Sequence, residues 1–269
     1  MTSDFIASAA QLACLLEASA PKPGNVSPGR DFPDASYPDF LASAAAIGPV
    51  FAADLPLGAT IHAAIRATSQ WTRSNTNLGL VLLLAPLAQA ARRSTKPLRE
   101  ALQGVLAATT IDDAREVYAA IRLARPGGLG TAAEEDIAGE PRVSLVEAMR
   151  LAADRDSIAA EYVTDYRVTF EIGLPALIAA RSHGWLEATV RTFLALLAAV
   201  PDTLISRKRG TAVALDVSAQ AKRVLSAGPE GRAQFDQRLR ADRLNPGTTA
   251  DLTAAVIYVA LLAGAWDTR

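Results

Sequence analysis

Apolar side chains recur along the chain with the spacing of an α-helix. The first such face is formed by Phe5, Ala9, Leu12 and Leu16. Steps of three and four residues place these side chains on one side of a helix, and Pro21 is expected to end it. A second helix is predicted from Pro38, because proline is favoured at the first helical position.

The same spacing continues to the C-terminal end of the chain. It predicts further helices over residues 57–71, 77–92, 97–108, 112–124, 144–154, 157–181, 185–199, 203–226, 230–243 and 249–265. No stretch alternates polar and apolar residues for long enough to predict a strand, and the helix formers alanine and leucine outnumber the β-branched residues. The sequence therefore predicts an all-α fold, a single multi-helix globular domain over residues 1–269 with a central core of apolar helices.

Two runs, residues 78–88 and 252–266, are the longest apolar stretches. Both are shorter than the roughly 20 residues that cross a bilayer, so they predict helices buried on all sides at the centre of the domain. The N-terminus carries Asp4 and lacks the basic segment of a secretory signal. These observations favour a cytoplasmic protein without a membrane segment.

Charge and residue counts exclude several classes of function. The chain has 27 Lys and Arg against 28 Asp and Glu, a net charge of −1, which offers no general attraction to nucleic acid or anionic lipid. Any phosphate binding must therefore be local. One cysteine and two histidines are too few for a thiolate and imidazole zinc site, and Cys14 is expected in the core.

A lysine between two prolines follows the first helix. Pro21 and Pro23 stiffen the chain around Lys22, and Gly24 permits a backbone turn that other residues resist. A lysine held in this way can meet a phosphate as a fixed point charge, while Asn25 offers both a donor and an acceptor. An ordinary helix-exit turn with a solvated lysine explains the same pattern.

Three polar residues, Asn75, Thr76 and Asn77, precede a very apolar helix. The free N–H groups and positive dipole end of a helix suit an anion. An N-cap explains one such residue well, but three in a row less well.

Two further segments suggest phosphate chemistry. Residues 126–130 form a glycine-rich turn through which backbone amides can approach a phosphate, although P-loop spacing and a preceding strand are both missing. Arg207 and Lys208 belong to a basic triplet before Gly210. That triplet can clamp a polyphosphate or form the cationic end of a helix.

Carboxylates gather in two places. Asp154 and Asp156 lie close enough in sequence to hold Mg²⁺, which prefers oxygen ligands, although a solvated charged turn is the alternative. Asp251 lies in the first turn of the last helix, where the helix dipole is a complete structural reason for an acidic residue.

Taken in order, five segments resemble the triphosphoribosyl-dephospho-CoA synthase family. They are residues 21–26, 75–79, 126–130, 202–208 and 245–252. The family is all-α, and its better-known members use ATP and 3′-dephospho-CoA. They displace adenine and join C1′ of the ATP ribose to the ribose of dephospho-CoA, which makes the precursor of an acyl carrier protein prosthetic group.

The chain departs from those members in two segments. Residues 22–27 read Lys-Pro-Gly-Asn-Val-Ser, where relatives have Lys-Pro-Gly-Leu-Val-Asp. Residues 75–79 read Asn-Thr-Asn-Leu-Gly, where relatives have Asn-Thr-His-Lys-Gly. This form is similar to a branch found in archaea and methylotrophic bacteria, so a related ribosyl transfer in methanopterin- or methanofuran-linked cofactor synthesis is an alternative.

The resemblance implies a set of roles for residues of this sequence. Phosphate-binding and nucleotide-binding roles are expected for Lys22, Gly24, Asn25, Asn75, Thr76, Asn77, Arg207 and Lys208. Asp154 and Asp156 are expected to hold the Mg²⁺ that accompanies ATP, and Glu17 or Asp31 to be the base that activates the acceptor hydroxyl. The expected partners are small molecules and not nucleic acid, and assembly into a homo-oligomer stays open.

Two other classes of function remain at this point. A non-catalytic nucleotide-binding partner would bind ATP and release no adenine. An all-α hydrolase that cleaves an N-glycosidic bond would use water as the acceptor, so that free ribose triphosphate would form.

Overall fold

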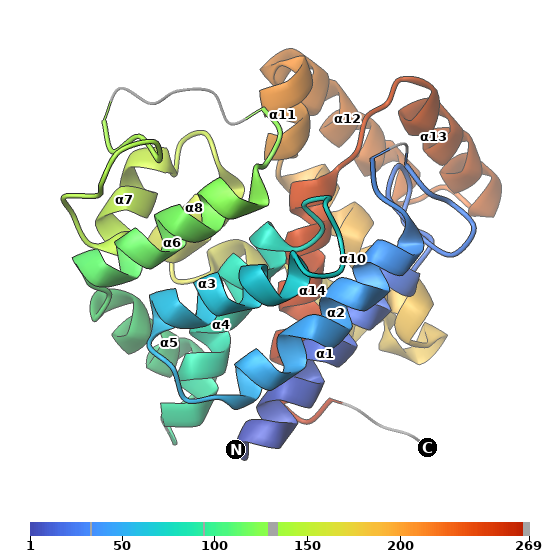
Figure 1. Cartoon of the computed structure of the whole chain (residues 1–269). Helices are drawn as coiled ribbons and strands as arrows, with labels where there is room; N and C mark the ends of the chain where they lie inside the picture. Colours follow the sequence, from blue (N-terminus) through green and yellow to red (C-terminus); the bar gives the residue numbers. More distant parts are fainter. Residues whose placement is uncertain (33, 94, 129–133, 266–269) are drawn as a thin grey trace.

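The computed structural model describes residues 1–32, 34–93, 95–128 and 134–265, which fold into helices without a strand (Figure 1). The first half contains α1 (Ser3–Ser19), α2 (Tyr37–Ala52), α3 (Leu57–Thr68), α4 (Leu78–Arg93), α5 (Leu98–Ala107) and α6 (Ile111–Ala124). The second half contains α7 (Leu145–Ala152), α8 (Ser157–Val163), the π-helical turn η1 (Val168–Gly173), α9 (Leu174–Ala180), the 3₁₀ turn η2 (Arg181–His183), α10 (Trp185–Ala199), α11 (Thr203–Arg209), α12 (Thr211–Val224), α13 (Pro229–Ala241) and α14 (Gly247–Leu262). The predicted all-α class is confirmed.

Helix α14 runs through the middle of the molecule, with α1, α4 and α10 packed around it (Figure 1). Residues 252–262 of α14 and residues 80–91 of α4 are all buried. A helix that is buried around its whole circumference needs apolar residues on every side, which explains the two long apolar runs. The prediction that these runs form central helices is confirmed.

Among the described residues, no single helix is both long and apolar enough to cross a membrane. Helices α10 and α11 together reach the length and apolar composition of a membrane span, but the chain bends by 56° between them.

A second, smaller apolar cluster joins α10, α12 and α13. Phe193 and Phe235 are its large aromatic members, and it also includes Ala20, directly after α1, and Leu244, shortly before α14. The residues that follow α1 and those that precede α14 therefore pack against the same cluster. This arrangement brings the loop after α1 next to the start of α14.

The predicted continuous helix over residues 157–181 is wrong. The chain leaves α8 and turns at Tyr166, whose φ is +56°. The buried carboxylate of Glu161 then accepts hydrogen bonds from the amides of Val168 and Thr169, each at 2.9 Å, and so starts η1. The apolar spacing survives the break because both halves pack on the core, so periodicity alone could not reveal it.

The predicted helix over residues 203–226 is also wrong, because it breaks at Gly210. That glycine has a φ of +95°, a conformation that ends α11 and that side chains with a Cβ resist. Asp202 caps the start of α11 by accepting a hydrogen bond from the amide of Ile205 at 3.0 Å. The short α11 therefore ends in a basic last turn directly before this break.

Candidate active site

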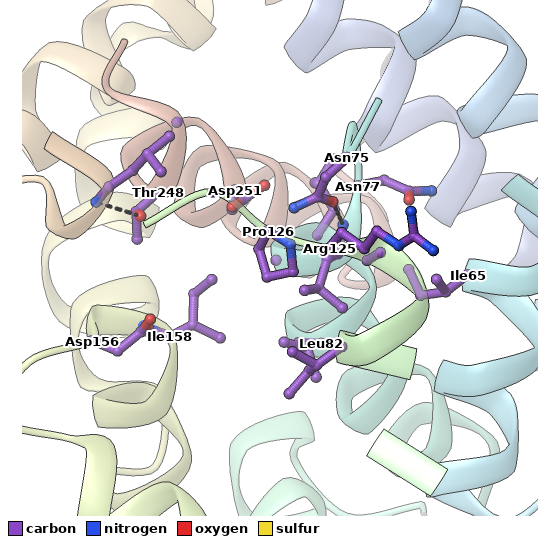
Figure 2. A pocket seen from close by; sticks show the side chains of 18 of the residues that line it. Ile65, Asn75, Asn77, Leu82, Arg125, Pro126, Asp156, Ile158, Thr248 and Asp251 are labelled. Carbon is purple, nitrogen blue, oxygen red and sulfur yellow. Dashed lines mark hydrogen bonds between the residues drawn. The ribbon is translucent and has the colours of Figure 1, made fainter. Parts of the chain in front are cut away.

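A cavity of about 910 Å³ opens beside the start of α14 (Figure 2). Its size suits a nucleotide-sized ligand. The predicted site residues that line it are Glu17, Asn25, Asn75, Thr76, Asn77, Asp156, Arg207 and Lys208. The other four, Lys22, Gly24, Asp31 and Asp154, lie in the described chain but outside this lining.

Lys22 is buried beneath the cavity as the counter-ion of Glu17. Its Nζ lies 2.9 Å from Oε1 of Glu17, and it also donates to the backbone oxygens of Glu17 and Ala20. The ammonium group is thus surrounded by oxygens of α1 and of the residue that follows it. The expectation that Lys22 meets a phosphate is therefore corrected: its charge holds the Glu17 carboxylate, which does line the cavity.

Burial acts on both members of this ion pair. It raises the pKa of Glu17 and lowers the pKa of Lys22, because a charged group loses hydration inside the protein. The attraction between the two charges opposes both shifts.

Gly24 shapes the loop after α1 and does not contact the cavity. Its φ is +68°, its amide donates to Oδ1 of Asp236 at 2.8 Å, and an added Cβ would lie 2.7 Å from Leu239. The next residue, Asn25, donates from Nδ2 to Oδ1 of Asn245 at 2.9 Å and lines the cavity. The loop is thus fastened to both α13 and the segment that precedes α14.

The three polar residues before α4 have separate local roles. Asn75 accepts a hydrogen bond from the first amide of α4 at 3.1 Å, so the capping explanation holds for it. Thr76 shares a hydrogen bond of 2.5 Å with Ser43 of α2, and Asn77 donates to Thr68 of α3 at 2.8 Å. These hydrogen bonds hold the segment between α2 and α3, and all three residues also line the cavity.

Asp154 and Asp156 do not form a carboxylate pair in the cavity. Asp154 is exposed outside it, whereas Asp156 caps α8 with Oδ1 at 2.8 Å from the amide of Ile158 and pairs Oδ2 with Arg207 at 2.5 Å. Within the described chain, no group of three or more histidine, cysteine or acidic residues is placed to hold a metal ion. The arrangement thus does not supply the predicted pair of metal ligands.

Asp31 also has a local role, because its Oδ1 accepts a hydrogen bond from the amide of Tyr37 at 2.7 Å at the start of α2. Its side chain does not line the cavity. Of the two expected bases, only Glu17 reaches the cavity.

The basic end of α11 lies against the glycine-rich turn. An added Cβ on Gly127 would lie 3.2 Å from Cε of Lys208, and one on Gly128 would lie 3.6 Å from Cβ of Arg207. The absence of side chains at these glycines lets the turn approach both cations closely. The rest of this predicted segment, residues 129 and 130, lies outside the described residues.

Asp251 is a cavity residue that the sequence analysis explained only by the helix dipole, but α14 begins at Gly247 and has no acidic residue in its first turn. Its carboxyl lies beside Gly79, at the start of α4, where an added Cβ would be 2.0 Å from Oδ2. None of the described residues donates a hydrogen bond to it, and its exposed surface faces the cavity. The signal for this position is the contact between Gly79 and Asp251. The two residues are far apart in the sequence, so no local spacing relates them.

The surroundings of Asp251 disfavour its negative charge. Burial raises the pKa of Asp251 well above its usual range, and repulsion by Glu17, Asp202 and Asp156 adds to that rise. Arg207 opposes the shift of this pKa. The site therefore combines one carboxyl whose neutral form is favoured by its surroundings with a second carboxyl that is paired with a lysine.

The comparisons with known proteins agree with this geometry. The family model described as ATP:dephospho-CoA triphosphoribosyl transferase matches residues 3–269. The chain belongs to this family. A solved structure from Archaeoglobus fulgidus, provisionally described as a triphosphoribosyl-dephospho-CoA synthase, matches this triphosphoribosyl transferase family member with a TM-score of 0.69.

The two chains are 31% identical, and the match covers 83% of this chain and 99% of the archaeal one. No curated protein matches the chain. The family resemblance predicted from the five motif segments is confirmed. In this transferase fold each of the five contributes to one cavity, through Asn25, Asn75, Pro126, Arg207 and Asp251 among others.

Proposed function

We propose that this protein transfers the 5-triphosphoribosyl group of ATP to 3′-dephospho-CoA and releases adenine. The observation that carries the proposal is the meeting of all five family segments at a single cavity of about 910 Å³. Those segments are dispersed along the sequence, and a shared ligand accounts for their convergence on the same space.

The charged residues of the cavity suit the two halves of the donor. Arg207 and Lys208 are proposed to supply positive charge for the triphosphate. Glu17 and Asp251 are proposed to act at the ribose, because departure of adenine leaves positive charge near C1′ and nearby carboxyl groups stabilise such an oxocarbenium-like state. Glu17, held by Lys22, is the proposed base for the acceptor hydroxyl.

Mg²⁺ is proposed to enter with ATP as part of the substrate. The ion commonly keeps waters and phosphate oxygens as most of its ligands, so it does not require a dedicated protein cage. Asp154 lies outside the cavity, and Asp156 is bonded to Arg207 and to α8, so the pair does not fit a resident metal site. We assign no protein ligand to the ion.

The direct test incubates the purified protein with ATP and Mg²⁺, with and without 3′-dephospho-CoA, and follows the products by mass spectrometry. Adenine together with a triphosphoribosyl conjugate is the expected result. Adenine with free ribose triphosphate would indicate a hydrolase. Failure to consume ATP in either mixture would contradict the proposal.

A substitution of Lys208 separately tests the proposed contact with the triphosphate. Lys208→Ala should raise the KM for ATP by about tenfold, as expected from the loss of one charge-assisted contact, with little change in kcat. Lys222→Ala, at an exposed position on α12, is the matched control and should leave KM unchanged. Equal KM values for Lys208→Ala and the unmodified protein would remove Lys208 from the site.

A further inference from the structure

Asp251 and Glu17 enter the same cavity from two different helices, but their surroundings differ. Glu17 is ion-paired with Lys22, whose ammonium group also donates to the backbone oxygens of Glu17 and Ala20. Asp251 has no donor among the described residues. Because Gly79 has no side chain, Oδ2 of Asp251 occupies the space beside the start of α4.

Figure 2 shows Asp251 on α14 among the other residues that line the pocket. In that view it appears between Thr248 and Asn75, which also line the cavity. A substrate atom in the cavity can therefore reach it without displacing a protein partner.

The charged groups around Asp251 come from several elements. Glu17 of α1, Asp156 at the start of α8 and Asp202 before α11 are acidic, and Arg207 of α11 is the opposing cation. Cys14 of α1 lies in the same electrostatic environment as a buried neutral thiol, whose pKa burial raises. Arg207 also pairs with Asp156 at 2.5 Å, so its guanidinium group interacts with both carboxyl groups.

We propose that Asp251 is the acid that protonates the departing adenine, while Glu17 is the base that receives the proton of the acceptor hydroxyl. This assignment deepens the proposed function and rests on it. The two carboxyl groups divide the roles because Glu17 is ion-paired with a lysine, whereas Asp251 has no ion pair among the described residues and lies near three further acids.

The step balances as a single exchange. The bond between C1′ and N9 breaks, and its electron pair goes to adenine. The carboxyl proton of Asp251 moves to a ring nitrogen of the adenine. The acceptor oxygen forms the new bond to C1′, and Glu17 takes its proton. Release of that proton by Glu17 and uptake of one by Asp251 restore both groups, so no net proton is consumed.

The raised pKa of Asp251 supports this order, because an acid catalyst must still be protonated at the working pH. The pKa of Glu17 is raised by burial too, but Lys22 opposes that rise. The charged form of Glu17 is therefore favoured by a paired cation that Asp251 lacks among the described residues.

The test compares two donors that differ in their need for an acid. Adenine requires protonation to leave readily, whereas the nitrophenolate of 4-nitrophenyl riboside 5′-triphosphate leaves unassisted. Asp251→Asn should lower kcat with ATP by about 10²–10⁴-fold, the usual contribution of a general acid, and leave kcat with the nitrophenyl donor essentially unchanged. Asp112→Asn, an exposed acid on α6, is the control and should behave as the unmodified protein with both donors.

A pH profile gives a second readout that does not depend on the variant folding. With ATP, kcat of the unmodified protein should fall as the pH rises through the pKa of Asp251, and this fall should be absent with the nitrophenyl donor. Equal losses on both donors in Asp251→Asn, or an undiminished rate with ATP, would overturn the assignment. If the unmodified protein turns over the nitrophenyl donor yet releases no adenine from ATP, the proposed function itself fails, and the acid assignment with it.

Discussion

Removal of the Lys22 ammonium leaves the Glu17 carboxylate buried without its counter-ion. Lys22→Met should therefore lower the free energy of unfolding by about 3–5 kcal/mol, the range found when one partner of a buried pair is deleted. Urea denaturation followed by circular dichroism measures this loss.

The double variant Glu17→Gln, Lys22→Met is the control for the ion pair. It removes both charges, so it should recover much of the stability that the single variant loses. A single variant that loses less than about 1 kcal/mol, as exposed pairs do, would show that water reaches the pair.

Gly79 tests the placement of Asp251 without removing its carboxyl group. In Gly79→Ala the new Cβ would lie 2.0 Å from Oδ2 of Asp251, so that carboxyl must rotate away. Since the contact is with the end of a side chain, the fold should survive while kcat with ATP falls about 10²-fold, as for a catalytic group displaced by about 1 Å.

Gly104, in α5, provides the control for the Gly79 substitution, because a Cβ added there would have no atom within 4 Å. Gly104→Ala should keep full activity and gain about 0.5–1 kcal/mol of stability, because alanine loses less backbone entropy in a helix. Equal kcat values for the two variants would argue against a precise position for Asp251.

At the scale of elements, α13 holds the loop after α1 through one buried carboxylate. Asp236 accepts hydrogen bonds from the amide of Gly24 at 2.8 Å and from Nε of Arg240 at 2.9 Å, and it pairs with Arg30 at 2.5 Å. Arg240 also donates to the backbone oxygen of Asn25 at 2.5 Å. The loop that carries Asn25 into the cavity therefore depends on a helix distant in sequence.

Asp236→Asn should lower the free energy of unfolding by about 1.5–3 kcal/mol, the contribution of hydrogen bonds to a charged group. It should also raise the KM for ATP, because the loop positions Asn25 and Lys22. Thermal unfolding and steady-state kinetics measure the two effects. Asp216→Asn, which removes an exposed pair with Arg238, should change stability by less than about 1 kcal/mol and leave KM unaltered.

The elements themselves were largely predictable from the sequence, because helical spacing and caps depend on residues a few positions apart. The two wrong helices had a common cause. In residues 157–181 the break requires the carboxylate of Glu161 to reach the amides of Val168 and Thr169. In residues 203–226 it requires one glycine in a left-handed conformation, and neither event disturbs the apolar pattern.

At the scale of the whole molecule, Asp251 makes the free energy of unfolding depend on pH. Its pKa is raised in the folded protein, so its neutral form is the one that folding favours. The stability contribution is fully present below the usual pKa of an aspartate and is lost as the pH rises through the raised pKa. Asp251→Asn should consequently be as stable as the unmodified protein at low pH and more stable at high pH.

Urea denaturation of both proteins across the pH range measures this difference. Asp112→Asn removes an exposed acid and should follow the unmodified protein at every pH. A constant offset between Asp251→Asn and the unmodified protein, without pH dependence, would mean that the carboxyl is ionised equally in both states.

The sequence by itself determined the all-α class, the two central apolar helices, the family and the segments that form the cavity. Each of these depends on residue spacing or on motifs that are contiguous in the chain. Only the tertiary structure decided that Lys22 faces Glu17 and not a phosphate, and that Asp251 faces the cavity beside Gly79. Those outcomes depend on how α1, α4 and α14 pack, which sets the burial and the charged neighbours of each group, and no local pattern records them.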